Sequence, residues 1–199
     1  MNARHTRVAI IGGGPAGLMA AEVLSNACIQ VDLFDAMPSV GRKFLMAGKG
    51  GMNLTHAEPF DQFLARYGDR QTQLNPILKA FGPEQLRQWC TELGIDTFVG
   101  SSNRVFPKDM KAAPLLRAWL HRLRERGVRF HMRHRWTGWD RDGCLHFTTP
   151  GDERVVTADG HAVCVRANGD GGCCRSVKRL LGVGTAVDQQ RGDRTTGCN

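Results

Sequence analysis

The 199-residue sequence has no apolar run that approaches the roughly 20 residues needed to cross a bilayer. The run before the first glycines is also too short for the apolar core of a signal peptide. We therefore expect a cytoplasmic protein with no membrane partner. The hydrophobic fraction of 41% is ordinary for a globular domain, which excludes a collagen-like or wholly disordered chain.

The sequence also lacks the patterns of several enzyme and metal-site classes. No Ser-His-Asp set or pair of carboxylates stands out, and there is no Cys-x-x-Cys pair. We expect the cysteines to be reduced in the cytosol, and none to bind a metal. The seven are Cys28, Cys90, Cys144, Cys164, Cys173, Cys174 and Cys198. Cys28 and Cys90 adjoin apolar residues, so we interpret both as small buried side chains rather than nucleophiles.

Lys and Arg outnumber Asp and Glu by 27 to 19, and the net charge of +8 could attract nucleic acid, membranes or anionic ligands. We interpret the densest group of cations as a solvated face: Arg117, Arg122, Arg124, Arg126, Arg129, Arg133 and Arg135. The histidines in this stretch, His121, His131 and His134, are expected to face solvent as well. No RNA-binding motif accompanies them, so we predict no nucleic acid partner.

The first 35 residues predict the start of an α/β fold. Residues 7–11 form a short apolar run rich in β-branched residues, which is typical of a buried strand. Residues 18–27 suit a helix packed on a sheet, and residues 29–35 alternate like a second strand. A strand, glycine turn, helix and strand within 30 residues predict two parallel strands. We therefore predict a Rossmann-like dinucleotide-binding domain.

Further elements are expected along the rest of the body. Helices are predicted at about 59–67, 73–81, 83–94 and 112–126, and strands at 96–99 and 128–132. A glycine-rich loop is expected over 36–58, and a hairpin with a third strand, forming a β-meander, over 136–158. The amino-acid composition changes after residue 160. We expect residues 161–199 to be a divergent, poorly ordered tail with at most a weak initial strand.

The turn after the first strand carries the dinucleotide fingerprint Gly12-x-Gly14-x-x-Gly17 in its required context. The first glycine allows a tight turn, the second lets the backbone approach a pyrophosphate, and the third lets helix and strand pack closely. Pro15 and Ala16 complete the turn. The start of the following helix offers free amides and the positive end of its dipole to phosphates.

Asp35 ends the second strand, where a carboxylate can accept hydrogen bonds from ribose hydroxyls. It would repel a 2′-phosphate, so NADP is disfavoured at this site, whereas NAD and FAD both stay open. The loop that follows combines Gly41-Arg42-Lys43 with the segment from Gly48 to His56. Glycine-rich backbone can surround an anion, and Asn53 and Thr55 add side-chain donors and acceptors. We expect His56 to be a surface loop residue.

Three ordered motifs carry a resemblance to a known family. They are the glycine fingerprint, the GRK segment with the loop GKGGMNLTH, and Arg104-Val105-Phe106-Pro107 before the long helix. Over residues 5–160 the sequence resembles bacterial FAD-dependent flavoproteins described as uncharacterised NAD(P)/FAD-dependent or aminoacetone-oxidase-like oxidoreductases. The resemblance implies cofactor-binding roles for Gly12, Gly14, Pro15, Ala16, Gly17, Asp35, Arg42, Lys43, Gly50, Gly51, Asn53 and Thr55. The pyrophosphate would lie on the glycine turn, the adenosine ribose on Asp35, and the 41–55 loop near the flavin.

The resemblance further implies an oxidoreductase that transfers hydride between FAD and a small organic substrate, with NAD(P)H a candidate reductant. It indicates no catalytic acid or base. Members of the family are much longer and return to complete the FAD site after a second domain. We therefore expect residues 1–160 to be an incomplete FAD-binding domain of an apparently truncated chain. The alternative is a nucleotide-binding remnant without catalytic activity.

Overall fold

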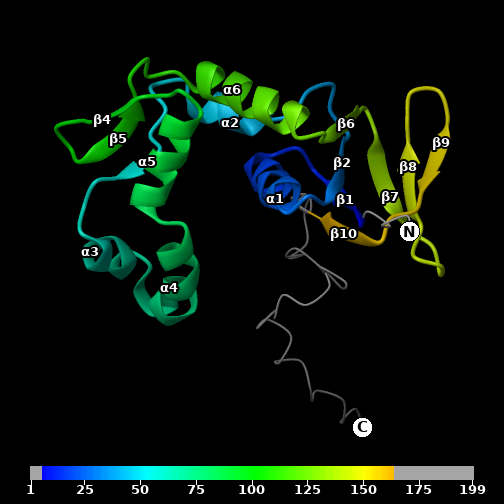
Figure 1. The fold of residues 1–199 in the computed structure, drawn as a ribbon, viewed down its shortest axis with the longest axis horizontal. Helices are drawn as coiled ribbons and strands as arrows, with labels where there is room; N and C mark the ends of the chain where they lie inside the picture. Colours follow the sequence, from blue (N-terminus) through cyan, green and yellow to red (C-terminus); the bar gives the residue numbers. More distant parts are fainter. Residues whose placement is uncertain (1–5, 164–199) are drawn as a thin grey trace, which may run out of the picture.

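The computed structural model describes residues 6–163, so most of the predicted tail, from residue 164, lies outside the described residues (Figure 1). A four-stranded parallel sheet with the strand order β10-β1-β2-β6 lies in the middle of the molecule. Its strands are β1 (Arg7–Ile11), β2 (Gln30–Asp35), β6 (Arg129–Met132) and β10 (Gly160–Val163). The parallel pairing of β1 and β2 is confirmed. The weak strand expected near residue 160 is present as β10, which begins at Gly160 and pairs with β1.

Two further sheets and the helices surround this centre. The sheets have the orders β3-β5-β4 and β7-β8-β9. In chain order the remaining elements are α1 (Pro15–Asn26), α2 (Arg42–Ala47), β3 (Thr55–His56), α3 (Phe60–Ala65), the 3₁₀ helix η1 (Gly68–Arg70), α4 (Gln71–Ala80), α5 (Pro83–Glu92), β4 (Thr97–Val99), β5 (Arg104–Pro107), α6 (Ala112–Glu125), β7 (Arg135–Trp139), β8 (Leu145–Thr148) and β9 (Glu153–Val156). None of the described helices is long and apolar enough to span a membrane.

Both faces of the parallel sheet are covered, because successive side chains of a strand point to opposite faces. Val8 and Ile10 of β1 pack into the cluster that contains residues of α1 and α6. Ala9 and Ile11 of the same strand pack with the antiparallel sheet β7-β8-β9. The predicted β-meander is therefore confirmed, and it forms the cover of one sheet face.

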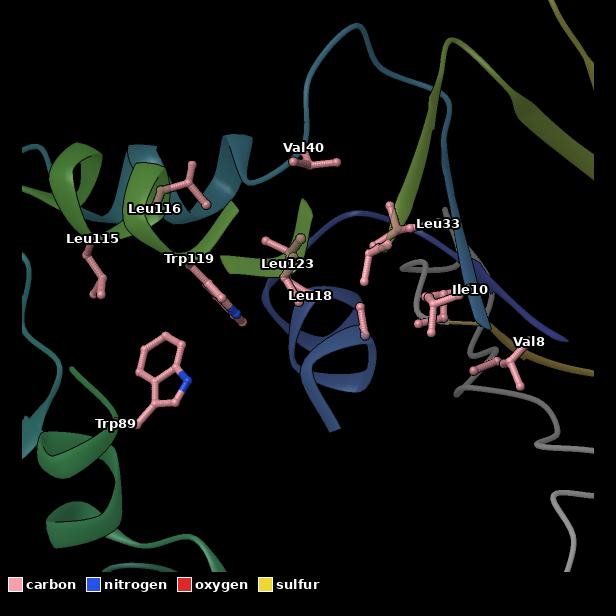
Figure 2. Close-up of a cluster of buried hydrophobic side chains, with 14 of the residues drawn as sticks. Val8, Ile10, Leu18, Leu33, Val40, Trp89, Leu115, Leu116, Trp119 and Leu123 are labelled. Atoms are coloured by element: carbon pink, nitrogen blue, oxygen red, sulfur yellow. The ribbon is translucent and has the colours of Figure 1, made fainter. Parts of the chain in front are cut away.

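The larger core joins the sheet to the long helix α6. The predicted helix over 112–126 is confirmed, and its apolar residues Leu115, Trp119 and Leu123 are each at most 2% exposed. In Figure 2, Val8 lies at the sheet end of the cluster, and Trp89 of α5 lies at the other end beside Trp119. The two indole rings meet edge to face, with their centroids 4.8 Å apart.

The predicted loop over residues 36–58 is only partly a loop. It contains the helix α2, whose Phe44 contacts Trp119 edge to face at 6.2 Å between ring centroids, and it ends in the short strand β3. The segment Arg104–Pro107 forms β5, the central strand of the sheet β3-β5-β4. Short elements of this kind form because a partner from elsewhere in the chain covers them, which local sequence patterns do not show. With α3–α5 this sheet makes a lobe at the opposite end of the molecule from the meander (Figure 1).

Most of the arginine-rich stretch is exposed, as predicted, but two buried carboxylates pair with some of its arginines. Glu22 of α1 is 5% exposed, accepts a hydrogen bond from Trp119 Nε1 at 3.1 Å, and pairs with Arg126 at 2.7 Å and Arg122 at 2.8 Å. A buried carboxylate needs such partners to offset the loss of water. These arginines therefore connect α6 and the residue after it to α1.

The second buried carboxylate is Asp32 of β2, which is 1% exposed. Arg7 Nε lies 2.6 Å from it, and Arg129 and His131 Nε2 each lie 2.7 Å from it. His131 also stacks on Phe34, with ring centroids 4.5 Å apart. The expectation that His131 and His134 face solvent is wrong. Pairing of β6 with β2 and the meander packed beside it leave both rings only partly exposed.

Candidate dinucleotide-binding site

The glycine turn between β1 and α1 has the geometry that the fingerprint predicts. The Gly12 amide donates to the Phe34 carbonyl at 2.8 Å, and its φ of +106° lies in the region that favours glycine. A Cβ on Gly17 would lie 1.9 Å from the Gly12 carbonyl oxygen. A Cβ on Gly14 would meet no atom within 4 Å. Gly12 and Gly17 are therefore required by the fold, whereas Gly14 leaves open space beside the backbone.

The first turn of α1 presents polar backbone to that space. Gly14 is the N-cap, Pro15 occupies the first helical position, and no side chain caps the helix or adds an acidic group. The first amides of a helix have no acceptor within it, and the dipole places partial positive charge there. Pro15 and Ala16 are exposed. This end of α1 is thus suited to an anion such as a phosphate.

Asp35 is fixed beside the turn by two backbone amides. Gly13 donates to its Oδ2 at 2.6 Å and Met37 donates to its Oδ1 at 2.7 Å. An ionised carboxylate offers about four lone-pair sites, so each oxygen can accept a further hydrogen bond. The structure thus places Asp35 at the glycine turn, with capacity left for a pair of hydroxyl groups.

Gly13 and Gly41 also shape this site, although they are not among the residues for which the resemblance implied a cofactor-binding role. A Cβ on Gly13 would lie 2.2 Å from Val40 Cγ1, and the Gly41 amide donates to the Gly13 carbonyl at 2.8 Å. Gly41 itself has a φ of +69°. The run of three glycines and the glycine before Arg42 were the available signals. Gly41 therefore contacts the glycine turn, and the exposed residues Arg42 and Lys43 follow it directly in the chain.

The rest of the predicted cofactor loop bonds elsewhere. The Met52 amide donates to the Met110 carbonyl at 2.9 Å, and the Leu54 amide donates to the Val105 carbonyl at 2.8 Å. Thr55 begins β3. Gly50, Gly51, Asn53 and Thr55 are therefore carried by the lobe of β3-β5-β4, whereas the Arg42 segment is carried by the glycine turn. In the structure the predicted site consists of two groups of residues: one at the glycine turn and the start of α2, and one that follows α2 in the chain.

The cysteines described by the structure differ in their environments. Cys90 is fully buried, as predicted, and burial raises the pKa of its thiol to about 11. Cys28 corrects our expectation: it is exposed and has a φ of +57°, because it lies in the tight connection between α1 and β2. Within residues 6–163, no three potential metal ligands are grouped to hold an ion.

We therefore predict a clear difference in thiol reactivity. Iodoacetamide at about pH 8 should alkylate Cys28 and leave Cys90 unmodified, because a thiol with a raised pKa forms little thiolate. Peptide mapping by mass spectrometry reports each site separately. In urea both peptides should react equally, which controls for recovery. Alkylation of Cys90 in the native protein at the rate of Cys28 would contradict the burial of that helix face.

Comparison with known proteins agrees with this geometry. The family model of the HI0933-like protein Rossmann domain matches residues 6–171. The 3-dehydro-bile acid delta(4,6)-reductase of Clostridium scindens is 30% identical over 127 residues, which are 63% of this chain and 30% of the reductase. The putative oxidoreductase UacF of Escherichia coli K12 is 53% identical over 38 residues, which are 19% of this chain and 6% of UacF. The matched segments thus cover less than a third of these relatives.

Solved structures show the same fold at low identity. The 3-ketosteroid-delta4-(5alpha)-dehydrogenase of Rhodococcus jostii RHA1 superposes with a TM-score of 0.58 at 14% identity, covering 82% of this chain and 46% of the dehydrogenase. A flavocytochrome c3 fumarate reductase gives a TM-score of 0.52 at 17% identity, covering 79% of this chain and 33% of that one. The parallel sheet, glycine turn and matched family model agree with one another, and the chain belongs to the HI0933-like protein Rossmann domain family.

Proposed function

We propose that the chain binds FAD at the glycine turn and serves as the cofactor domain of an oxidoreductase acting on a small organic molecule. The observation that carries the proposal is the open space beside Gly14 at the free amides of α1, with the carboxylate of Asp35 held by the amide of the adjacent Gly13. The residues present fit the cofactor, because its pyrophosphate needs amide donors and its adenosine ribose needs a hydroxyl acceptor.

Each group of residues has a separate task in this proposal. The Gly14 and Ala16 amides donate to the pyrophosphate, and Asp35 accepts from the ribose. Arg42 and Lys43 lower the cost of bringing negative charge to the turn. When bound, FAD supplies the capacity to accept or donate a hydride, and the protein supplies its position and electrostatic environment.

The lobe residues complete the arrangement. Gly50 and Gly51 present backbone without side chains, and Asn53 and Thr55 present polar groups that can orient the flavin. A small organic substrate would meet the flavin on the side of these lobe residues. We propose NAD(P)H as a reductant, to be tested by anaerobic addition of NADH or NADPH and observation of whether the visible flavin absorbance is lost.

The test of FAD binding is the variant Gly14→Ala. Gly14 has a φ of −78°, and its Cβ position is empty, so alanine fits the fold. The added methyl group would instead occupy the approach of the pyrophosphate, and we expect FAD affinity to fall at least about tenfold, a loss of about 1.4 kcal/mol. Affinity is measured by titrating the desalted apoprotein with FAD and following flavin fluorescence.

The matched control is Gly151→Ala in the β8–β9 connection. Its Cβ position is also free of neighbours, and it lies outside the proposed site. Gly151→Ala should bind FAD like the unaltered protein. Equal FAD affinity in Gly14→Ala, or no flavin binding by the unaltered chain, would contradict the proposal.

A further inference from the structure

A pocket of about 450 Å³ lies in the lobe, between β3 and the helices α3, α4 and α5. None of the predicted cofactor-binding residues lines it. Its volume is within the range of small-molecule sites. Its walls combine apolar side chains (Phe60, Leu78 and Pro83) with the polar or charged side chains of His56, Glu58 and Lys79. This mixture is typical of a site that holds an apolar body and orients it by a few polar groups.

His56 supplies the first polar group. It lies in β3, half-buried rather than in the surface loop that we expected. Its Nδ1 atom is buried and has no hydrogen-bond partner among the described residues. A buried polar atom without a partner is costly. A ligand that hydrogen-bonds to this nitrogen would remove that cost.

The charges around the pocket favour an anionic group. Glu58, whose side chain is 10% exposed, is held by two hydrogen bonds from Arg66, and these lower the pKa of its carboxyl group. Glu84 lies 3.6 Å from Arg87. Lys79 makes no ion pair with any carboxylate that the structure describes, although it lines the same pocket. The cation left without a partner and the orphan nitrogen of His56 both suit an acceptor with negative charge.

We propose that this pocket binds a small molecule carrying one carboxylate and an apolar body. The carboxylate accepts hydrogen bonds from His56, protonated at Nδ1, and from the ammonium group of Lys79. The apolar body packs on Phe60, Leu78 and Pro83. Charge-assisted hydrogen bonds of this kind are stronger than neutral ones, so a neutral analogue of the same shape binds more weakly.

The pocket is distinct from the FAD loop. Adjacent residues of a strand point to opposite faces, so Thr55 and His56 are directed to opposite sides of β3. A ligand on His56 therefore approaches β3 from the side away from Thr55. Binding here is independent of the proposed FAD site, and either proposal can fail without the other.

The experiment uses 4-phenylbutyrate as the probe and the full ¹⁵N-labelled chain, observed by two-dimensional NMR. At about 1 mM, a concentration at which a ligand of millimolar affinity half-saturates its site, the probe should shift the amides of the non-proline residues among 56–60 and 78–87. The amides of residues 12–17 should stay unshifted. The matched probes 4-phenylbutyramide and 4-phenylbutylamine should bind at least about tenfold more weakly.

The variant Lys79→Gln should reduce the affinity for 4-phenylbutyrate to that of the amide. Lys108→Gln, at an exposed lysine outside the pocket, should leave this affinity unchanged. The spectrum of each variant recorded without the probe shows whether that variant is folded. His56→Gln should lower the affinity for 4-phenylbutyrate and reduce the difference in affinity between 4-phenylbutyrate and 4-phenylbutyramide. Equal binding of carboxylate and amide, tighter binding of the amine, shifts elsewhere, or no shifts at all would overturn the proposal.

Discussion

Gly17→Ala should lower the free energy of unfolding by about 3 kcal/mol, although alanine normally favours a helix over glycine. The reason is the contact with the preceding strand. A Cβ at position 17 would lie 1.9 Å from the Gly12 carbonyl oxygen and 3.4 Å from Ile10 Cγ2. The first contact is with backbone, which cannot rotate away. The helix must therefore move from the sheet, and the turn that it begins must deform with it.

Thermal unfolding followed by circular dichroism measures the effect, and we expect the midpoint to fall by roughly 6–12 °C for a chain of this size. Gly14→Ala is the matched control, because it lies in the same turn and adds the same methyl group to open space. Its midpoint should stay close to that of the unaltered protein, while its FAD affinity falls. The two variants together separate the glycine required by packing from the glycine proposed to admit the cofactor. Unchanged stability in Gly17→Ala would mean that α1 and β1 do not pack at this distance.

The glycine turn could be predicted from the sequence because its causes are local. The order of strand, glycines, helix and acidic strand end lies within 30 residues, and each residue type has one steric or electrostatic reason to be there. Gly12 shows this by its positive φ, and Asp35 by its place beside the turn. The same local logic indicated α1, α6 and the meander.

The features that escaped prediction depend on residues far apart in the chain. The helix α2 has six residues and is covered by α6, and β5 is a strand because β3 and β4 pair with it. His131 looked exposed among arginines, but its neighbour across the sheet is Phe34, nearly 100 residues earlier. A pattern of a few residues cannot specify such partners.

The pocket beside His56 illustrates the same limit for function. Its polar groups come from β3, from the connection between β3 and α3, and from α4 and α5, which no sequence spacing connects. In the sequence His56 stands at the end of the glycine-rich loop, and this position predicted a surface residue rather than part of a pocket. Only the packing of α5 against β3 shows that the histidine lines a separate pocket.

Asp32 offers the most sensitive test of how three neighbouring strands of the parallel sheet are held together. Its carboxylate receives Arg7 from β1, and Arg129 and His131 from β6, so it connects β2 to both neighbouring strands. Asp32→Asn keeps the shape and removes the charge. Breaking a buried charge pair by removing one partner costs about 3–5 kcal/mol, and we expect the lower end, because Arg129 is half exposed and water can solvate it.

The pH dependence of stability should change in the same variant. Burial raises the pKa of Asp32, but the hydrogen bonds from Arg7, His131 and Arg129 lower it more, so the pKa lies below its usual value. A carboxyl group whose pKa is lower in the folded state than in the unfolded state adds stability above its ordinary pKa of about 4. That contribution is lost as the pH falls through the lower pKa of the folded state. The unaltered protein should therefore lose stability in this range more steeply than Asp32→Asn.

Urea unfolding at several pH values from about 6 down to about 3 measures both effects, with stability at the highest pH giving the cost of the charge. Asp140→Asn is the matched control. Asp140 also faces a histidine, with His146 Nε2 at 3.0 Å, and the hydrogen bond from that histidine lowers its pKa. Since Asp140 is exposed, water replaces its partner, and the variant should differ little from the unaltered protein. Parallel pH curves for Asp32→Asn and the unaltered protein would show that Asp32 has the same pKa folded and unfolded. The arginines and histidine around it would then hold the strands by packing alone.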